Sequence, residues 1–216
     1  MSDWITPDWP APGNVRALFT TRNGGVSRGA NGVYASLNFG AHVNDNMADV
    51  ECNRALLRSH LPGEPKWLKQ VHGTLPIWID QTTTVTPEGD AVLSRKQGAV
   101  CAVMVADCLP VFLCDAAGTT VAIVHAGWRG LAGGIIEQTI AAMAMDHNNL
   151  MAWLGPAIGP DYFEVGADVY EAFVQQDAQA AQAFTPKNSN HEEKWLVDIF
   201  LLARQRLTSF GITEIY

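Results

Sequence analysis

The sequence predicts a single α+β domain, and three observations lead to this prediction. The chain has 216 residues, a length that suits one domain. Hydrophobic residues make up 48% of it and charged residues 17%, a composition that can bury a large core and is unlike that of a disordered chain. Strand-like and helix-like stretches follow one another without regular strand–helix–strand alternation. Because no repeat or linker divides them, we treat residues 1–216 as one domain.

Short apolar runs indicate strands, whereas apolar residues spaced three or four positions apart indicate helices. The first pattern predicts strands at 15–20, 36–40, 67–71, 76–79, 90–93, 100–106, 119–124, 151–154 and 213–216. The second predicts helices at 47–61, 131–145, 165–176 and 199–207, with Asp198 as the N-cap of the last. Segments 80–89 and 177–193 show neither pattern. We expect a surface loop in the first and a mobile stretch in the second.

The charge pattern argues against several classes of function. The net charge is −8 and Lys and Arg form no cluster, whereas a nucleic-acid-binding protein needs a basic patch. No apolar stretch reaches the roughly 18–20 residues that span a membrane, and the first residues do not form a signal peptide. We therefore expect a cytoplasmic protein that binds neither nucleic acid nor membrane. The sequence does not determine its oligomeric state.

Residues 99–136 contain the most reactive side chains of the chain. Two apolar runs lead to Cys108 and to His125, and His72 follows a third strand-like run upstream. Side chains at the ends of buried strands rest on rigid supports, so we expect these three residues to meet in space. The other three cysteines lie in patterns typical of buried core residues. No CxxC pair or secreted-type spacing suggests a disulfide.

One cysteine and two histidines form a ligand set that suits Zn²⁺ and leaves a fourth position for water or substrate. The same residues also suit chemistry without a metal, in which Cys108 is the nucleophile and His125 its base. The sequence leaves both mechanisms open. Asp107, beside Cys108, either orients one of the histidines or lies on the surface.

The turn after His125 is a candidate anion site. Gly127, Trp128, Arg129 and Gly130 link a predicted strand to a predicted helix. Backbone N–H groups at a helix start and an arginine fork both bind phosphate or carboxylate. Trp128 either stacks on a planar base or belongs to the core. The glycine spacing matches neither the dinucleotide fingerprint nor the P-loop.

Six motifs spread over nearly the whole chain form a specific set. They are FTTRNGGVS at 19–27, SLN at 36–38, QVHG at 70–73, ADCLP at 106–110, HAGWRG at 125–130 and LGPAIGP at 154–160. Together they resemble the bacterial laccase-domain family, also called the multicopper polyphenol oxidase family. The resemblance implies a mixed β-sandwich flanked by helices, in α/β/β/α layers like those of a group of cysteine hydrolases.

The resemblance also implies an activity. Family members are described as purine nucleoside phosphorylases that act on adenosine, inosine and methylthioadenosine with phosphate, and that also deaminate adenosine. The family's zinc ligands correspond to His72, Cys108 and His125, and we expect Arg129 to complete the catalytic set. We expect substrate contacts from Arg129 and from four further residues, namely Gly127, Trp128, Arg22 and Asn38. Zn²⁺ is the expected cofactor, with copper as the second possibility.

Two other functions compete with this one. One branch of the family is described as a peptidoglycan editing factor that removes L-serine from a UDP-MurNAc precursor, which would be amide hydrolysis at the same site. A copper-dependent polyphenol oxidase, or laccase, ranks below both, because six histidines and one suitable cysteine offer too few ligands for several copper ions. Family chains usually continue past the position of Tyr216, so we expect the family's C-terminal tail to be missing here.

Overall fold

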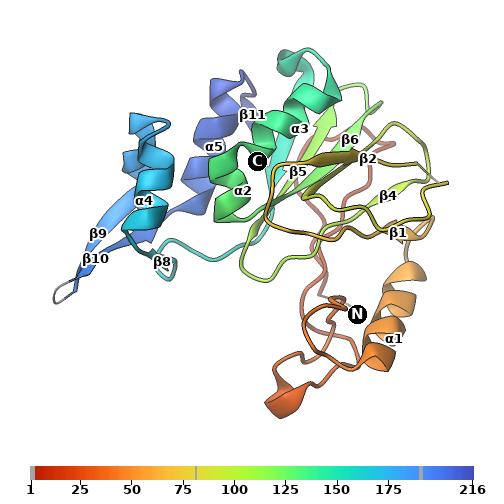
Figure 1. Ribbon diagram of the computed structural model, residues 1–216. Helices are drawn as coiled ribbons and strands as arrows, with labels where there is room; N and C mark the ends of the chain where they lie inside the picture. The colour runs from red at the N-terminus through yellow and green to blue at the C-terminus, as the bar shows by residue number, and fades with distance from the viewer. Residues whose placement is uncertain (1–2, 81, 190–191) are drawn as a thin grey trace.

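A mixed sheet of six strands lies at the centre of the molecule (Figure 1). The computed structural model describes residues 3–80, 82–189 and 192–216. The strands of the central sheet are β2 (Pro76–Trp78), β3 (Ala91–Ser94), β5 (Leu109–Asp115), β6 (Val121–Ala126), β7 (Leu150–Leu154) and β11 (Glu214–Ile215). Their spatial order is β11-β7-β5-β6-β3-β2. The four inner strands are antiparallel to their inner neighbours, and each edge strand is parallel to the strand beside it.

Two smaller sheets and the helices surround this sheet. In one small sheet, β1 (Pro65–Lys66) pairs with β4 (Val100–Cys101), and in the other, β10 (Glu192–Val197) lies between β8 (Glu164–Val165) and β9 (Phe184–Ser189). The α-helices are α1 (Met47–Arg58), α2 (Trp128–Gly133), α3 (Ile135–Met143), α4 (Ala167–Val174) and α5 (Ile199–Ser209). Short 3₁₀ turns occupy Ala30–Gly32, His147–Asn149 and Ala178–Ala183. Among the described residues, no helix is long and apolar enough to cross a membrane.

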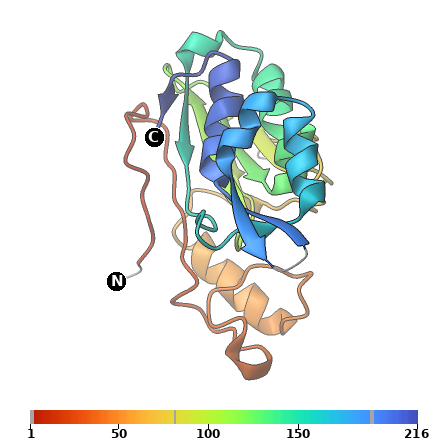
Figure 2. The same cartoon turned by 90° about the vertical axis from the view of Figure 1, so that its left-hand side faces the viewer.

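The hydrophobic core divides between the two faces of the central sheet, because successive side chains of a strand point to opposite sides. In β5, Val111 and Leu113 face the larger cluster, which includes buried residues of α3 and α5, whereas Phe112 faces a smaller cluster with Leu68 and Ile79. Helices cover the first face and the extended N-terminal segment runs along the other (Figure 2). The architecture is thus the predicted single-domain α+β fold with mixed sheets.

The prediction for segment 177–193 is wrong, since most of this segment is regular. It forms a 3₁₀ turn and the hairpin β9–β10, and residues 190–191 lie outside the described part. The hairpin is held by tertiary contacts, for β10 also pairs with β8 and Trp195 stacks on Tyr170 of α4 at 4.7 Å between ring centroids. Contacts of this kind leave no periodic signal in a local stretch of sequence.

The strands predicted at 15–20, 36–40 and 67–71 are also wrong. In the last of these, Lys69 makes only an isolated bridge with Glu88. Phe19 makes only an isolated bridge with Ile5, and residues 36–40 belong to the loops of a protruding N-terminal lobe, residues 20–62. One buried side chain of α1 organises these loops. The Asn53 amide accepts a hydrogen bond from the Val26 N–H and donates to Ser27 Oγ and to two backbone oxygens. A side chain therefore replaces the strand partner that the pattern suggested.

The helix predicted at 131–145 begins three residues earlier and is interrupted. Gly134 separates α2 from α3 with φ of 95°, a left-handed conformation that an L-residue adopts only with strain. The interruption turns the chain between the short helix that follows the site and the longer helix that packs on the sheet. A glycine inside an apolar pattern therefore marks the boundary of two helices here.

We predict that Gly134→Ala lowers the free energy of unfolding by about 1–2 kcal/mol, the usual penalty for a left-handed alanine. A Cβ there would meet no atom closer than 3.6 Å, so the backbone conformation and not a clash sets the effect. Chemical denaturation measures the change. Gly13→Ala is the matched control, because its Cβ would meet nothing within 4 Å and its φ is not positive. Equal stability of the two variants would contradict the prediction.

Candidate metal centre

One end of the central sheet carries the candidate site. Because β6 is antiparallel to both β3 and β5, the end of β6 lies beside the beginnings of its two neighbours. His125 is the penultimate residue of β6, and Cys108 directly precedes β5, whose Leu109 pairs with Ala126. The ladder between β5 and β6 therefore places the cysteine next to the histidine.

Two details of this end differ from the sequence prediction. The strand predicted at 100–106 ends at Cys101, and Cys108 directly precedes a new strand instead of ending the earlier one. Pro110 does not break that strand. Pro110 is the second residue of β5 and lies opposite His125. The Pro110 carbonyl accepts a hydrogen bond from Gly155 N–H at 2.9 Å. A proline is tolerated at the end of a strand because its missing N–H is not needed there.

The side chains of His72, Cys108 and His125 meet at this end of the sheet. Their possible ligand atoms all lie within 4.8 Å of one another. His72 Nε2 is 3.8 Å from Cys108 Sγ, and the two imidazole rings are 4.7 Å apart between centroids at an angle of 74°. His125 is buried, Cys108 is half-buried and His72 is exposed. The chain thus presents two imidazoles and one thiol from three separate segments toward a common point.

This arrangement fits a zinc ion. Zn–S and Zn–N bonds of about 2.3 and 2.0–2.1 Å in a tetrahedral site separate the ligand atoms by roughly 3.3–3.6 Å, close to the separation of His72 and Cys108. The backbone at Gly127 closes one side of the site. A Cβ there would lie 2.8 Å from His72 Cδ2 and 2.9 Å from Cys108 Sγ. The donor set also suits copper, so the geometry does not identify the metal.

Asp90 is a member of the site that the sequence analysis missed. This fully buried residue directly precedes β3, and its carboxylate accepts a hydrogen bond from His125 Nδ1 at 2.8 Å. The same carboxylate accepts from the backbone N–H groups of residues 71–73. One signal could have revealed it, namely an acid directly before the apolar run Ala91–Leu93, since a buried carboxylate requires hydrogen-bond donors.

The electrostatics of this pair favour neutral His125 and ionised Asp90. Burial lowers the pKa of His125, and this effect outweighs the hydrogen bond to Asp90, which acts in the opposite direction. Burial alone would raise the pKa of Asp90, but the hydrogen bonds from His125 and from the backbone N–H groups of 71–73 hold that pKa below its usual value. An ionised carboxylate only accepts hydrogen bonds, so Nδ1 of His125 carries the proton and Nε2 keeps a free lone pair.

The surroundings of Cys108 disfavour a free thiolate. Burial raises the pKa of its thiol, and the negative charges of Asp107 and Asp90 raise it further. A thiolate at this position therefore needs a cation nearby. Asp107 itself is exposed, and its backbone oxygen accepts a hydrogen bond from Ile158 N–H. Of the two interpretations left open for Asp107, the structure supports a surface acid, because Asp90 is the carboxylate that orients the histidine.

The turn at 127–130 lies directly beside this centre. Gly127 is the N-cap of α2, and the Arg129 guanidinium rests over the Trp128 ring, 4.3 Å from its centroid. No other described residue forms a hydrogen bond or ion pair with the Arg129 guanidinium, so its donors are available to a ligand. Trp128 packs against the main core, which favours the core role over base stacking. The helix that follows has only 6 residues.

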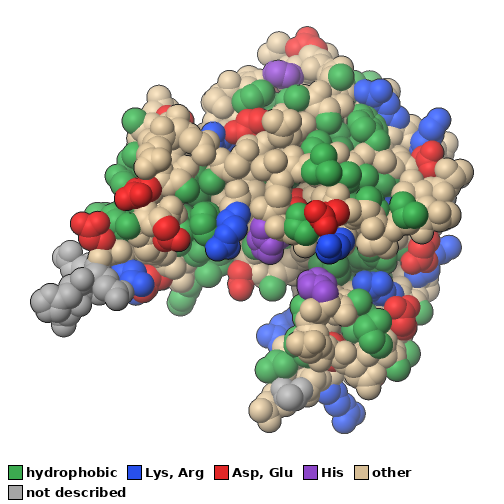
Figure 3. All heavy atoms as spheres, viewed as in Figure 1, with side chains coloured by type: hydrophobic (Ala, Val, Ile, Leu, Met, Phe, Trp, Pro, Cys, Tyr) green, Lys and Arg blue, Asp and Glu red, His purple; other side chains and the backbone are tan. Residues whose placement is uncertain are grey.

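Arg22 and Asn38, predicted substrate contacts, lie in the N-terminal lobe and are engaged within it. Arg22 Nε donates to the carbonyl of Ala35, and the Asn38 amide donates to Asp45. Figure 3 shows that this lobe projects from the body and leaves a hollow beside it, with histidine side chains on both sides of the hollow. A substrate contact from these two residues stays a prediction.

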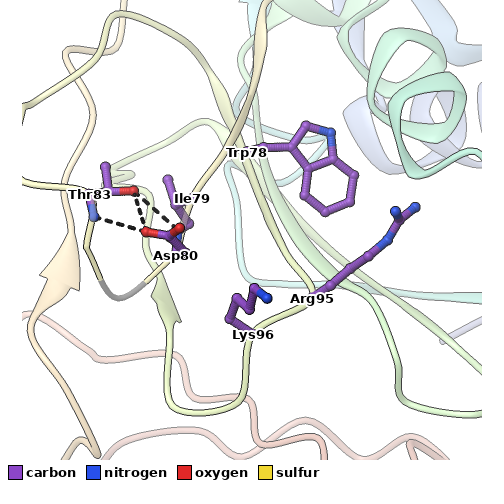
Figure 4. A pocket seen from close by; sticks show the side chains of 6 residues that line it. All are labelled: Trp78, Ile79, Asp80, Thr83, Arg95 and Lys96. Atoms are coloured by element: carbon purple, nitrogen blue, oxygen red, sulfur yellow. Dashed lines mark hydrogen bonds between the residues drawn. The ribbon is translucent and has the colours of Figure 1, made fainter.

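A separate cavity of about 330 Å³ lies away from the metal centre (Figure 4). It is lined by Trp78, Ile79, Asp80, Thr83, Arg95 and Lys96. These residues lie at or after the C-terminal ends of β2 and β3, whereas the candidate centre lies beside the N-terminal ends of these two strands. The Arg95 guanidinium covers the Trp78 ring at 4.7 Å. This cavity therefore takes no part in the centre.

Comparison with known proteins identifies the family. Residues 16–216 match the family model described as multi-copper polyphenol oxidoreductase laccase. The chain belongs to this family. Among laccase-family relatives, a Shigella flexneri protein named purine nucleoside phosphorylase YfiH is 50% identical over 100% of this chain and 87% of its own. A Pseudomonas aeruginosa protein named purine nucleoside phosphorylase PA4543 is 47% identical over 100% of this chain and 86% of its own.

Solved structures of similar proteins share the fold. The Neisseria meningitidis protein NMB0706 superposes with a TM-score of 0.92 at 47% identity, over 99% of this chain and 86% of its own. YlmD from Geobacillus stearothermophilus gives a TM-score of 0.83 at 26% identity, over 99% of this chain and 84% of its own. The laccase family is thus an enzyme family whose similar curated members carry the name purine nucleoside phosphorylase.

We predict that the purified protein holds about one Zn²⁺ per chain and that Cys108→Ala loses most of it, because removing the only soft ligand weakens the site. Elemental analysis after dialysis measures the metal. Cys101→Ala is the control, since Cys101 lies in β4 and burial raises the pKa of its thiol to about 12. Full zinc in the Cys108 variant would overturn the metal assignment and favour Cys108 as a nucleophile.

We predict that Gly127→Ala weakens zinc binding by at least about tenfold, as expected when a metal site is disturbed from its surroundings. The new Cβ would lie too close to both His72 and Cys108, so both side chains or the backbone between them must shift. Competition with a chromogenic chelator measures the affinity. Gly159→Ala serves as the control, because its Cβ would meet nothing within 4 Å. Unchanged affinity in the Gly127 variant would show that the backbone does not confine the ligands.

Proposed function

We propose that this protein is a zinc-dependent purine nucleoside phosphorylase that cleaves adenosine, inosine and methylthioadenosine, with adenosine deamination as a second activity. The observation that carries the proposal is the convergence of His72, Cys108 and His125 next to the turn that carries Arg129, whose guanidinium forms no hydrogen bond or ion pair with another described residue. The names of relatives at 47–50% identity over the whole chain support the same activity. An open zinc centre supplies Lewis acidity and activates water at neutral pH, which suits both reactions.

Phosphorolysis places two demands on the protein itself. A phosphate oxygen must attack C1′ of the ribose while the bond between C1′ and the purine nitrogen breaks, and a proton must reach the departing base. Phosphate is a weakly nucleophilic and strongly hydrated anion, so it must be held in place. The Arg129 guanidinium can hold it with paired hydrogen bonds, because no other described residue engages its donors. The face of the neighbouring Trp128 ring contacts the guanidinium in a cation–π interaction.

A copper-dependent phenol oxidase is less well supported despite the family's descriptive name. Within the described residues, one group of three or more potential ligands is present, and it is the group already described. A multicopper centre needs several such groups. Removal of serine from a cell-wall precursor uses the same centre but needs no phosphate, because water is the nucleophile in amide hydrolysis. Dependence on phosphate therefore separates the two leading reactions.

We predict that inosine yields hypoxanthine and ribose-1-phosphate at a rate that rises with phosphate concentration and saturates. Arg129→Ala should raise the KM for phosphate and cost on the order of 2–4 kcal/mol in kcat/KM, the range for removing a preorganised donor to a developing charge. Arg129→Lys should recover only part of this loss, since ammonium lacks the planar fork. Product analysis by mass spectrometry at varied phosphate measures each quantity.

Arg95→Ala is the matched control for this experiment. Arg95 also covers a tryptophan ring, but at the opposite end of the sheet, so its loss should leave the KM for phosphate unchanged. Free ribose at a rate independent of phosphate would show that phosphorolysis is wrong. Release of serine from UDP-MurNAc-serine by the same preparation would then make precursor editing the better interpretation.

A further inference from the structure

The three side chains of the centre come from segments far apart in the sequence, and the links between these segments determine whether the centre exists before metal binds. Cys108 and His125 are joined by the ladder of β5 and β6, in which Leu109 pairs with Ala126. His72 lies in no strand, since residues 71–75 form a loop between β1 and β2. Something other than a sheet must therefore hold His72 in place.

Asp90 provides the link between His72 and His125. Oδ1 accepts hydrogen bonds from His72 N–H at 2.9 Å and from His125 Nδ1 at 2.8 Å. Oδ2 accepts from Val71 N–H at 3.2 Å and Gly73 N–H at 2.7 Å. A carboxylate has about four lone-pair positions for hydrogen bonds, so this one is fully used. One anionic side chain thus holds the backbone of the loop and the ring of the second histidine.

The backbone of the loop explains why an anion is needed. His72 has φ of 58°, in the left-handed region that residues other than glycine rarely adopt. This conformation makes consecutive N–H groups converge on one point, and such a concavity binds anions. Without the carboxylate, three buried or half-buried donors would face one another and the loop would relax. The strained conformation of His72 therefore depends on Asp90.

Gln70 provides the link between His72 and Cys108. Its side-chain amide donates from Nε2 to the carbonyl of Met104 at 2.8 Å and accepts from the N–H of Met104 at 2.7 Å. The amide therefore pairs with Met104 as the backbone of a neighbouring strand would. Met104 lies four residues before Cys108, and Gln70 lies two residues before His72. The pairing thus fixes the two ligand-bearing segments against each other.

We propose that Asp90 and Gln70 are positioning residues that hold His72 at metal-binding distance from His125 and Cys108 before the metal arrives. Each of the three pairs of segments then has its own link, namely the β5–β6 ladder, the Asp90 carboxylate and the Gln70 amide. Asp90 also sets the tautomer of His125, because an acceptor at Nδ1 leaves the Nε2 lone pair free for a metal. This inference rests on the metal site of the proposed function.

The decisive experiment compares zinc affinities of Asp90→Asn and Asp115→Asn in the full chain, by competition with a chromogenic chelator. An asparagine at 90 presents an NH₂ group to two of the four donors. It also allows His125 to accept at Nδ1 and to carry its proton on Nε2. We expect zinc affinity to fall about 10–100-fold, the usual loss when the partner of a metal-binding histidine is changed.

Asp115→Asn is the matched control. Asp115 is an equally buried carboxylate that accepts from Thr120 N–H at 2.6 Å and Thr119 Oγ1 at 3.0 Å. It lies at the opposite end of β5 from the centre. This variant should melt earlier than the wild type but retain the wild-type zinc affinity. Equal affinity losses in the two variants, or none in Asp90→Asn, would overturn the proposal.

Two further measurements do not depend on whether Asp90→Asn folds. Gln70→Met removes both hydrogen bonds to Met104 with little change in length, and it should weaken zinc binding about three- to tenfold, less than Asp90→Asn because one link of the three is lost without a change of tautomer. In the metal-free wild type, ¹⁵N NMR should show His125 protonated at Nδ1. Protonation at Nε2, or unchanged affinity in Gln70→Met, would contradict the proposal.

The outcomes separate this inference from the proposed function. Zinc affinity and the His125 tautomer are measured without nucleoside or phosphate, so a failure of phosphorolysis would leave both results standing. A wild-type protein that does not bind zinc would remove the metal site from the proposed function. The tautomer in the metal-free protein would then still show whether Asp90 orients His125.

Discussion

The buried carboxylate of Asp90 is the group on which the candidate site depends. Its four hydrogen bonds join a loop that has no sheet pairing of its own to the end of a central strand. Burying an unpaired carboxylate would cost several kcal/mol, so the residue is stable only while all its donors are in place. The loop at 71–73, in turn, keeps its left-handed residue only while the carboxylate is present. Each stabilises the other.

The central sheet supplies the rigid side of this arrangement. β5 is buried along its whole length, and β6 beside it is buried except at its first residue. Strands with side chains packed on both faces cannot shift without opening cavities in two clusters. His125 therefore has almost no freedom, and Cys108 follows from its position directly before β5. The exposed residues at the site are His72 and Arg129.

The charges around the centre are suited to a cation and an anion together. Asp90 and Asp107 both raise the pKa of the Cys108 thiol, so the site favours bound positive charge. Arg129 provides the opposite charge in the turn that follows His125, where its guanidinium lies over the Trp128 ring and forms no hydrogen bond or ion pair with another described residue. In the proposed reaction, a metal at the three ligands and the Arg129 guanidinium would give the neutral nucleoside and the anionic nucleophile separate binding partners.

The sequence by itself was sufficient for the fold class, for the existence of the helices predicted at 47–61 and 199–207, and for the convergence of His72, Cys108 and His125. These follow from local signals, namely apolar periodicity, an Asp at an N-cap, and reactive side chains beside apolar runs. The same local reasoning could not find the β9–β10 hairpin, the Asn53 network or Asp90. Their stability comes from partners 15–35 residues away, and a single sequence carries no record of which distant residues touch.

Only the tertiary structure decided that Asp90 and not Asp107 orients His125. The pairing of β3 with β6 brings Asp90 to the histidine, whereas Asp107 is exposed to solvent.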